Sequence, residues 1–255
     1  MDEKGDKTRT ACYLHLADCL ERMKDVEDAS VDLVLSDLPY GTTNCRWDSC
    51  INLERLWAEY LRIGRGAFVL FAQTPFDKVL GMSQIELLRY EWIWEKTAAT
   101  GHLNAKKMPM KAHENILVFY KKLPTYNPEK TTGHNRKSSV KRRDKSEIYG
   151  SQQFTELPYD STERFPRSVQ IFASDKQKLK LHPTQKPVDL CRFLIRTYTH
   201  PGDTVLDSCM GSGTTGAAAL LEGRNFIGIE NDPVIFEIAE SRLRSLTPTP
   251  KAGCV

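Results

Sequence analysis

The chain has 255 residues, of which 40% are apolar and 27% charged, and its net charge of +3 is only mildly basic. This is the composition of a soluble globular protein with one large α/β domain, with or without an insert, and the charge permits a polyanionic partner without demanding one. No apolar run approaches the ~20 residues that span a bilayer, and the charged N-terminus has no signal-peptide core, so no membrane partner is expected. The seven cysteines form no C-x-x-C pair, which argues against a disulfide framework and a structural zinc site and favours a reducing cytoplasm, so no metal is expected.

The first half of the chain predicts alternating strands and helices, as in an α/β fold. Strands are expected at 11–16, 31–35, 67–72, 90–96 and 115–120, and helices from about 20, at 52–63 and from 75 to about 88. The runs at 31–35 and 67–72 are continuously apolar, which is typical of buried parallel strands.

A candidate catalytic corner follows the strand expected at 31–35. Asp37, Leu38, Pro39 and Tyr40 come directly after it, at the carboxyl end of a strand, where open α/β sheets bind ligands. Pro39 restricts the backbone of Leu38, so the Leu38 carbonyl points in few directions. The Asp37 carboxylate and this carbonyl are two acceptors beside the flat Tyr40 ring, which matches the amino group of a nucleobase. The alternative is an ordinary Pro-Tyr turn.

The connection at 97–114 is too long for a tight turn, so we expect a functional or mobile loop. Its Lys106, Lys107 and Lys111 could contact phosphates, although a solvated charged loop has similar weight.

A polar segment at 121–179 then interrupts the apolar pattern. Within 121–145 there are nine basic and two acidic residues, among them Arg136, Lys137, Lys141, Arg142 and Arg143. This composition fits a recognition element for a polyanionic partner and equally a disordered basic loop, so we expect a segment that is mobile when free.

The C-terminal part predicts a helix from about 188, a strand at 203–207, a glycine turn, a helix to about 221 and a strand at 226–229. Gly211 and Gly213 would let the backbone approach a ligand closely. Asp207 faces the same crevice and could hold an ammonium, and Glu230 could accept both hydroxyls of a ribose. Residues 211–216 also match G-x-G-x-x-G, so a dinucleotide-dependent oxidoreductase is a rival, although Asp207 would repel a pyrophosphate.

Three motifs together resemble one family. Asp37-Leu38-Pro39-Tyr40 is similar to the Asp-Pro-Pro-Tyr motif of amino-group DNA methyltransferases, with Leu38 in place of the first proline. Residues 207–215, which include Thr214, resemble the S-adenosylmethionine motif of that family, where Pro and Phe are commoner than Ser208 and Cys209. Residues 182–187, with Lys186, resemble its cofactor-contacting motif. The order catalytic motif, insert, cofactor motif is that of the permuted beta type.

The resemblance implies a Rossmann-like methyltransferase sheet with helices on both faces, a circularly permuted motif order and a target-recognition insert. Its parts would be a catalytic half at 1–120, the insert at 121–179, a cofactor half at 180–246 and a tail at 247–255. Asp18 would contact the cofactor adenine, although an N-cap role is as plausible from the residues. The activity would be direct, in-line methyl transfer from S-adenosylmethionine to adenine N6 in a flipped base of double-stranded DNA.

Several alternatives stay open from the sequence. Cytosine N4 methylation uses similar geometry, but the family favours Ser where this chain has Asp37. An RNA or protein substrate and a non-catalytic DNA-binding module are further readings. A homodimer, a cognate restriction endonuclease and a location at the nucleoid of a prokaryotic cell, encoded by the host or a phage, are expectations that only the resemblance supports.

Overall fold

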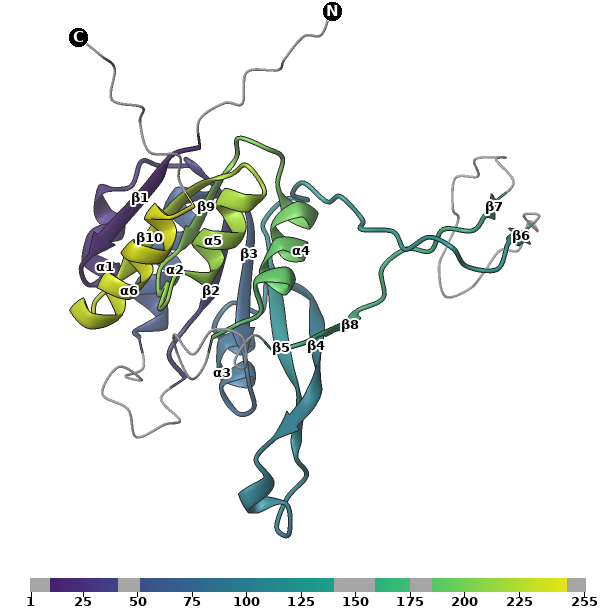
Figure 1. The fold of residues 1–255 in the computed structure, drawn as a ribbon. Helices are drawn as coiled ribbons and strands as arrows, with labels where there is room; N and C mark the ends of the chain where they lie inside the picture. Colours follow the sequence, from purple (N-terminus) through teal and green to yellow (C-terminus); the bar gives the residue numbers. More distant parts are fainter. Residues whose placement is uncertain (1–9, 41–50, 140–158, 175–184, 247–255) are drawn as a thin grey trace, which may run out of the picture. The chain divides into compact units, whose positions relative to one another are not determined.

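A computed structural model describes residues 10–40, 51–139, 159–174 and 185–246 (Figure 1). The chain forms two compact units, one of residues 1–127 and 168–255 and one of residues 128–167. The smaller unit covers fewer residues than the insert expected at 121–179, because residues 121–127 and 168–174 belong to the larger unit. The tail expected at 247–255 lies outside the described residues.

The larger unit contains an eight-stranded mixed sheet with the order β1-β10-β9-β2-β3-β5-β4-β8. Its strands are β1 (Cys12–Leu16), β10 (Asn225–Glu230), β9 (Thr204–Asp207), β2 (Val31–Asp37), β3 (Gly64–Ala72), β5 (Lys111–Phe119), β4 (Leu88–Thr100) and β8 (Val169–Phe172). The first five run parallel, β5 is antiparallel to both neighbours, and β8 is parallel to β4. Strands β9 and β10 from the end of the chain therefore lie between β1 and β2 from its beginning.

Helices cover both faces of this sheet, which confirms the predicted α/β fold (Figure 1). They are α1 (Cys19–Arg22), α2 (Leu53–Ile63), α3 (Phe76–Ser83), α4 (Val188–Tyr198), α5 (Thr214–Leu221) and α6 (Pro233–Arg244), with short 3-10 turns η1 (Met23–Asp25) and η2 (His102–Asn104). The predicted helices and strands at these places are confirmed, and α6 is an addition. Its start is set by Asp232, whose side chain accepts from the backbone N–H groups of Val234 and Ile235.

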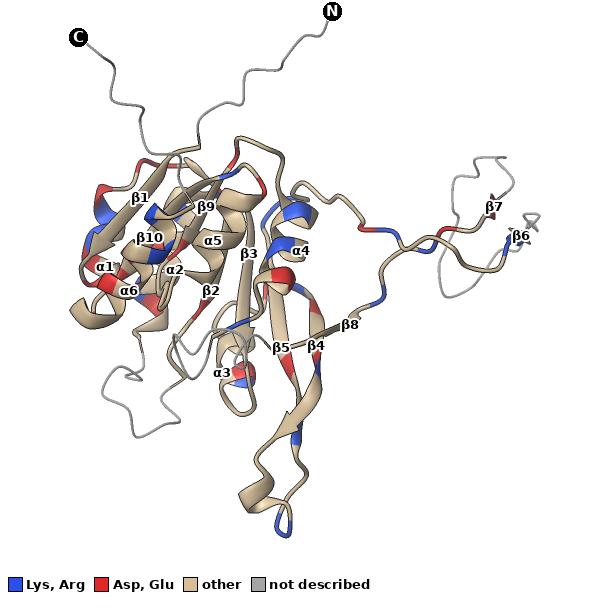
Figure 2. Ribbon diagram, viewed as in Figure 1, with Lys and Arg blue, Asp and Glu red and all other residues tan. Residues whose placement is uncertain are grey.

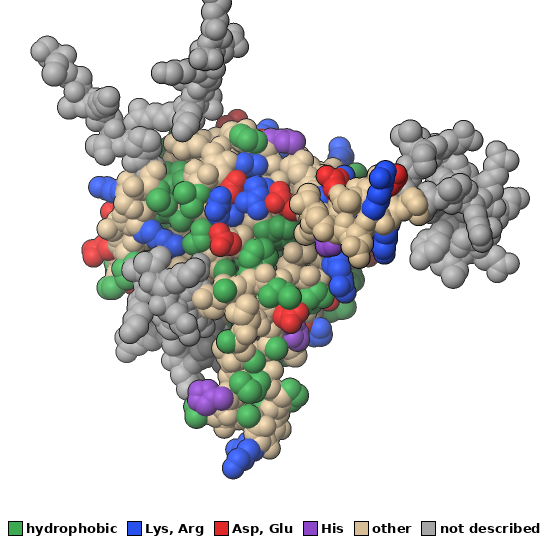
Figure 3. Space-filling view, turned by 45° about the vertical axis from the view of Figure 1, so that its right-hand side comes forward, with side chains coloured by type: hydrophobic (Ala, Val, Ile, Leu, Met, Phe, Trp, Pro, Cys, Tyr) green, Lys and Arg blue, Asp and Glu red, His purple; other side chains and the backbone are tan. Residues whose placement is uncertain are grey.

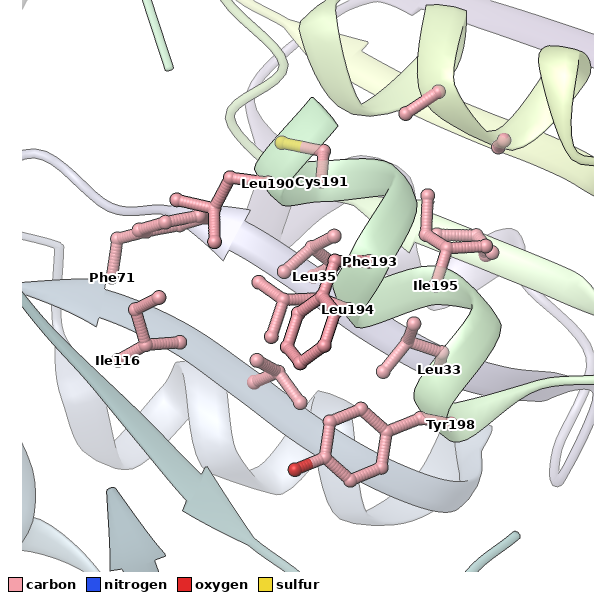
Figure 4. Close-up of a cluster of buried hydrophobic side chains, with 14 of the residues drawn as sticks. Leu33, Leu35, Phe71, Ile116, Leu190, Cys191, Phe193, Leu194, Ile195 and Tyr198 are labelled. Carbon is pink, nitrogen blue, oxygen red and sulfur yellow. The ribbon is translucent and has the colours of Figure 1, made fainter. Parts of the chain in front are cut away.

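Alternation along β2 and β3 divides the core into two layers. Leu33 and Leu35 pack with α4, α5 and α6 in one cluster, whereas Val34 packs with α1, α2 and α3 in the other. Figure 4 shows the first cluster, where Leu190 and Leu194 of α4 lie over the sheet. Each fully buried leucine or isoleucine contributes roughly 1.5–3 kcal/mol through removal of apolar surface from water. Burial on both faces explains why these strands are continuously apolar.

The loop expected at 97–114 is instead the outer part of a two-stranded hairpin. β4 continues to Thr100, η2 forms the tip, and β5 begins again at Lys111, with Thr100 opposite Lys111. Every residue from 97 to 113 is exposed, and the hairpin extends beyond the helical layers (Figure 1). The strand prediction failed here because both faces are solvated, which removes the hydrophobic pattern that marks a strand.

The smaller unit has little regular structure among its described residues. β6 (Lys137–Ser139) pairs antiparallel with β7 (Tyr159–Ser161), and Thr131 forms an isolated bridge with Arg164. Ion pairs reinforce the pairing, with Lys130 Nζ 2.9 Å from Glu163 and Arg136 Nε 2.6 Å from Asp160. Exposed pairs of this kind contribute at most about 1 kcal/mol each.

A close backbone approach beside the bulge in β2 predicts the effect of one substitution. A β-carbon at Gly66 would lie 1.8 Å from the Asp32 carbonyl oxygen, so Gly66→Ala must displace backbone between β2 and β3. We expect a loss of at least about 2 kcal/mol in the free energy of unfolding, measured with urea. Gly81→Ala is the control, because the nearest atom to its new β-carbon would be Leu88 Cδ2 at 3.5 Å. A loss no larger for Gly66→Ala than for Gly81→Ala would contradict the proposed clash.

Candidate active site

A cleft of about 730 Å³ opens at the carboxyl ends of β2 and β9. This volume lies within the roughly 300–1,000 Å³ of small-molecule and cofactor sites. Residues of both sequence halves line it. Of the predicted site residues these are Asp18, Asp37, Leu38, Pro39, Tyr40, Lys111, Lys186, Asp207, Gly211, Thr214 and Glu230. The structure therefore brings the catalytic corner and the cofactor motif to one place.

The catalytic corner is held by Tyr40. Its hydroxyl donates to Asp37 Oδ1 at 2.7 Å, and its ring stacks on Phe76 with centroids 5.2 Å apart. Leu38 buries its side chain in the core cluster with α1, α2 and α3. Packing thus restrains the position where the family has its first proline.

Lys186 contacts the catalytic corner. Its ammonium lies 2.7 Å from Asp37 Oδ2 and 3.0 Å from Glu114 Oε2. Lys96 approaches the other oxygen of Glu114 at 2.6 Å. The side chains of Lys186, Glu114 and Lys96 are only 11%, 9% and 7% exposed. Two carboxylates and two ammonium groups thus form one largely buried network whose formal charges cancel.

The charges in this network shift the pKa of Lys186 and of Glu114. Burial alone would lower the pKa of Lys186, but Asp37 and Glu114 outweigh burial and the pKa lies above its ordinary value. Burial alone would raise the pKa of Glu114, but Lys186 and Lys96 bring it below its ordinary value. Lys186 and Glu114 are therefore both charged at neutral pH, and removal of either one leaves an unbalanced buried charge.

Sequence reasoning missed Glu114 and Lys96. The available signal was an acid at the head of an apolar run, Glu114-Asn115-Ile116-Leu117-Val118-Phe119. An acid that is buried by its neighbours in a strand needs a cationic partner.

The cleft has two lobes, one at the catalytic corner of Asp37 and Tyr40 and the other around Glu230, where β10 ends. Glu230 Oε2 accepts from the backbone N–H of Gly211 at 3.0 Å, and Oε1 accepts from Asn231 and Asp232 at 2.9 Å. Gly211 has φ +50° and an open space where a β-carbon would be. Gly213 differs, because its β-carbon would meet Leu243 and Ala239 of α6 at 3.2–3.3 Å and it is absent from the described lining. Gly213 therefore serves packing between α5 and α6.

Asp18 accepts from the backbone N–H groups of Leu20 and Glu21 and caps α1, so the N-cap role is present, and the residue also lines the cleft.

Asp207, which also lines the cleft, is a buried residue. Its Oδ1 accepts from Ser36 Oγ at 2.8 Å and from the Cys209 N–H at 3.1 Å. Burial raises the pKa of Asp207 to about 6. A cation bound beside it would favour the ionised form.

Ser208, which stands where the family more often has proline, has a structural role. Its hydroxyl lies 2.6 Å from the hydroxyl of Tyr60 and 3.3 Å from that of Ser36. Tyr60 is fully buried, and its hydroxyl needs a partner. The serine provides one that a proline could not.

Gln185 is the strongest sign that a polar ligand binds in the cleft. It is 4% exposed and lines the cleft, yet neither its amide nitrogen nor its amide oxygen has a partner among the described residues. Buried amides are nearly always paired in native proteins. A ligand with its own donors and acceptors would satisfy this one.

The predicted DNA-contacting residues lie in different places. Lys106 and Lys107 are at the exposed end of the hairpin, and Lys111 lies 3.4 Å from Gln73 at the cleft. Arg136 pairs with Asp160 and Lys137 begins β6, while Lys141, Arg142 and Arg143 lie outside the described residues. Within the described residues, no group of three or more His, Cys, Asp or Glu side chains could hold a metal ion, and no helix is long and apolar enough to cross a membrane.

The comparison with protein families identifies the class. A family model described as DNA methylase matches residues 31–241, a stretch that includes Asp37, Tyr40, Asp207 and Glu230 of the cleft. The chain therefore belongs to the DNA methylase family. This membership overturns the interpretation of residues 211–216 as a dinucleotide-binding motif of an oxidoreductase.

Individual relatives agree with the family. The type II methyltransferase M.HinfI of Haemophilus influenzae is 28% identical over 269 residues, covering 91% of this chain and 68% of that protein. The DNA adenine methyltransferase YhdJ of Escherichia coli (strain K12) is 28% identical over 260 residues, covering 94% and 84%. The crystal structure of the M1.HpyAVI–SAM complex is similar with a TM-score of 0.62 and 26% identity, covering 91% of this chain and 98% of that one.

Asp207 predicts a pH-dependent stability. Its pKa is about 6 when folded and near its ordinary 3.8 when unfolded. The folded state therefore holds the proton more tightly, and the contribution of Asp207 to stability falls as pH rises from 3.8 through 6. Above pH 6 the full cost is about 3 kcal/mol. Asp207→Asn removes it, so the variant should exceed the wild type in free energy of unfolding at pH 7.5 and by roughly half as much at pH 5.

Urea unfolding at both pH values measures this difference. Asp189→Asn is the control, because that side chain is 76% exposed in the first turn of α4. A gain for Asp207→Asn that does not change with pH would refute the buried-carboxylate explanation.

Proposed function

We propose that this DNA methylase transfers a methyl group from S-adenosylmethionine to the N6 amino group of adenine in double-stranded DNA. One observation carries the proposal, namely that Asp37 and Tyr40 share a cleft with Asp207 and Glu230. The name of the relative YhdJ supports adenine as the target. Asp37 itself supports adenine over cytosine N4, since the resemblance associates the latter with serine.

The cofactor fits the lobe around Glu230. The Glu230 carboxylate would accept the ribose hydroxyls, Asp18 the adenine amino group, and Asp207 the ammonium, while Gly211 and Thr214 form the wall. The unpartnered amide of Gln185 supports a polar occupant of this cleft. When bound, S-adenosylmethionine supplies an electrophilic methyl group on a positively charged sulfur. The M1.HpyAVI structure is a complex with SAM.

The target adenine must leave the duplex, because its amino group is paired inside. At the catalytic corner the Asp37 carboxylate and the Leu38 carbonyl would accept its two N–H groups, and the Tyr40 ring would stack on its face. Oδ1 of Asp37 already accepts from the Tyr40 hydroxyl, but each carboxylate oxygen can accept a second donor. Withdrawal of the nitrogen lone pair from ring conjugation then directs it toward the methyl group. Positioning of this kind can save several kcal/mol.

Lys186 and Glu114 act as positioning residues for Asp37. The attacking nitrogen becomes positive as its new bond forms, and Asp37 is the nearest negative group proposed to touch it. Lys186 fixes the orientation of Asp37, while Glu114, between Lys186 and Lys96, keeps the set neutral. Lys186 was expected to contact the cofactor; its ammonium serves the catalytic carboxylate in this mechanism.

The smaller unit and the hairpin would bind DNA. The basic residues Arg136 and Lys137, with the segment 141–143, would contact phosphates and position the smaller unit, while contacts to base edges would read the target sequence. The proposed place of action is the prokaryotic cytoplasm, at the nucleoid. The name of M.HinfI as a type II methyltransferase supports a cognate restriction endonuclease as a partner; a homodimer stays a prediction from the sequence.

Expression in bacterial cells that lack their own DNA methyltransferases tests this function. Single-molecule sequencing should show N6-methyladenine at one short sequence context. Asp37→Ala should abolish the modification because it removes one acceptor, while calorimetry should find cofactor affinity within about threefold of wild type. N4-methylcytosine in its place would overturn the assignment of the atom, and unmodified DNA from a folded wild type that does not bind the cofactor would overturn the function.

A compensating second substitution tests the charge network. Glu114→Gln leaves two ammonium groups opposite one carboxylate, so we expect kcat to fall at least tenfold and stability by about 3 kcal/mol. Addition of Lys96→Met restores neutrality and should recover most of the lost kcat, with KM for the cofactor little changed in either variant. A double variant no more active than Glu114→Gln would show that Glu114 does not act through charge balance.

A further inference from the structure

The tip of the β4–β5 hairpin exposes large apolar side chains. Leu103 is 89% exposed, Met108 53% and Met110 41%. Residues 97–113 bury none of their side chains, so nothing in the described part of the chain covers this apolar surface. Figure 3 shows hydrophobic side chains together with histidine and lysine on this projection.

The tip is nevertheless an ordered turn. Gly101 adopts a left-handed conformation with φ +91°, and η2 follows. The backbone N–H of Asn104 donates to Gly101, and those of Lys107 and Met108 donate to Asn104, at 2.8–3.0 Å. Leu103 is therefore presented by a hydrogen-bonded turn.

The charge of the hairpin fits a polyanion. Residues 97–113 contain three lysines, two histidines and no acidic residue. Figure 2 shows lysine or arginine along the extension and at its tip. Lysines at such positions neutralise phosphates and give sequence-independent affinity.

The base of the same hairpin forms part of the cleft wall. Ala98, Thr100 and Lys111 line the cleft that holds Asp37. Leu103 follows Thr100 by three residues, which span at most about 11 Å even when fully extended, a distance comparable to a few stacked base pairs. DNA held with one base in the cleft would therefore have the tip alongside its neighbouring base pairs.

We propose that Leu103, supported by Met108, is an apolar wedge that enters the base stack of duplex DNA beside the extruded adenine. Leucine and methionine are among the side chains that DNA-bending proteins insert between bases. The wedge occupies space that the extruded base vacates and so offsets part of the cost of unstacking that base. This inference rests on the proposed function, and it assigns a task to residues outside the methyl-transfer machinery.

Two DNA duplexes test the wedge with the Leu103→Ser variant. Both carry the sequence context that genome sequencing identifies; in one the target adenine is paired with thymine, and in the other it is mispaired with adenine, which makes extrusion cheaper. We expect kcat/KM of Leu103→Ser to fall about tenfold or more on the paired duplex but less than about threefold on the mispaired one. Met108→Ser should show the same pattern more weakly.

Two control variants separate this role from others. Leu221→Ser changes a leucine that is 52% exposed at the end of α5, outside the described lining of the cleft, and should leave both rates unchanged. Lys106→Gln should weaken binding to both duplexes equally and reduce the salt dependence by about one unit of log–log slope.

Equal losses for Leu103→Ser on the two duplexes, or no loss on the paired one, would overturn the wedge. Failure of the proposed function is a different result, since the wild type would then methylate neither duplex.

Discussion

The pairing of β2 with β9 is the contact on which the site depends. These strands come from positions about 170 residues apart, and they run parallel with Leu33 opposite Val205 and Val34 opposite Leu206. Parallel strands end at the same edge of a sheet, so Asp37 and Asp207 open onto one cleft. Burial on both faces fixes this register, because a slip of one residue would exchange the two core layers. Geometry at the site is therefore a result of core packing.

Much of the fold could be predicted because its signals are local. Continuous apolar runs marked β2 and β3, and the glycine turn between β9 and α5 marked the cofactor lobe. The outer hairpin gave no such signal, since both of its faces meet solvent. Helix α6 was not predicted, although Asp232 and Pro233 form a recognisable helix start.

The site was predictable where motifs carry it and not where it depends on strand neighbours. Asp37 and Glu230 end strands, and their place in the cleft follows from that. Glu114 is part of the site because β5 returns beside β3, which no local pattern shows. Lys186 belongs to a motif that resembles a cofactor contact, yet the fold sets its ammonium against Asp37. Gly213 followed the glycine pattern but meets α6 instead of the cleft.

The balance of two acids and two amines around Glu114 has a consequence for kinetics at different ionic strengths. A set of charges that cancels internally has no monopole, and its field decays within a few ångströms. In the proposed complex, DNA would then be steered toward the protein by exposed lysines such as Lys106 and Lys107, which are open to counterions, with a screening length near 8 Å in physiological salt. Added electrolyte should therefore slow encounter while the bound complex reacts at an undiminished rate, so that capture and chemistry are governed by separate groups of charges.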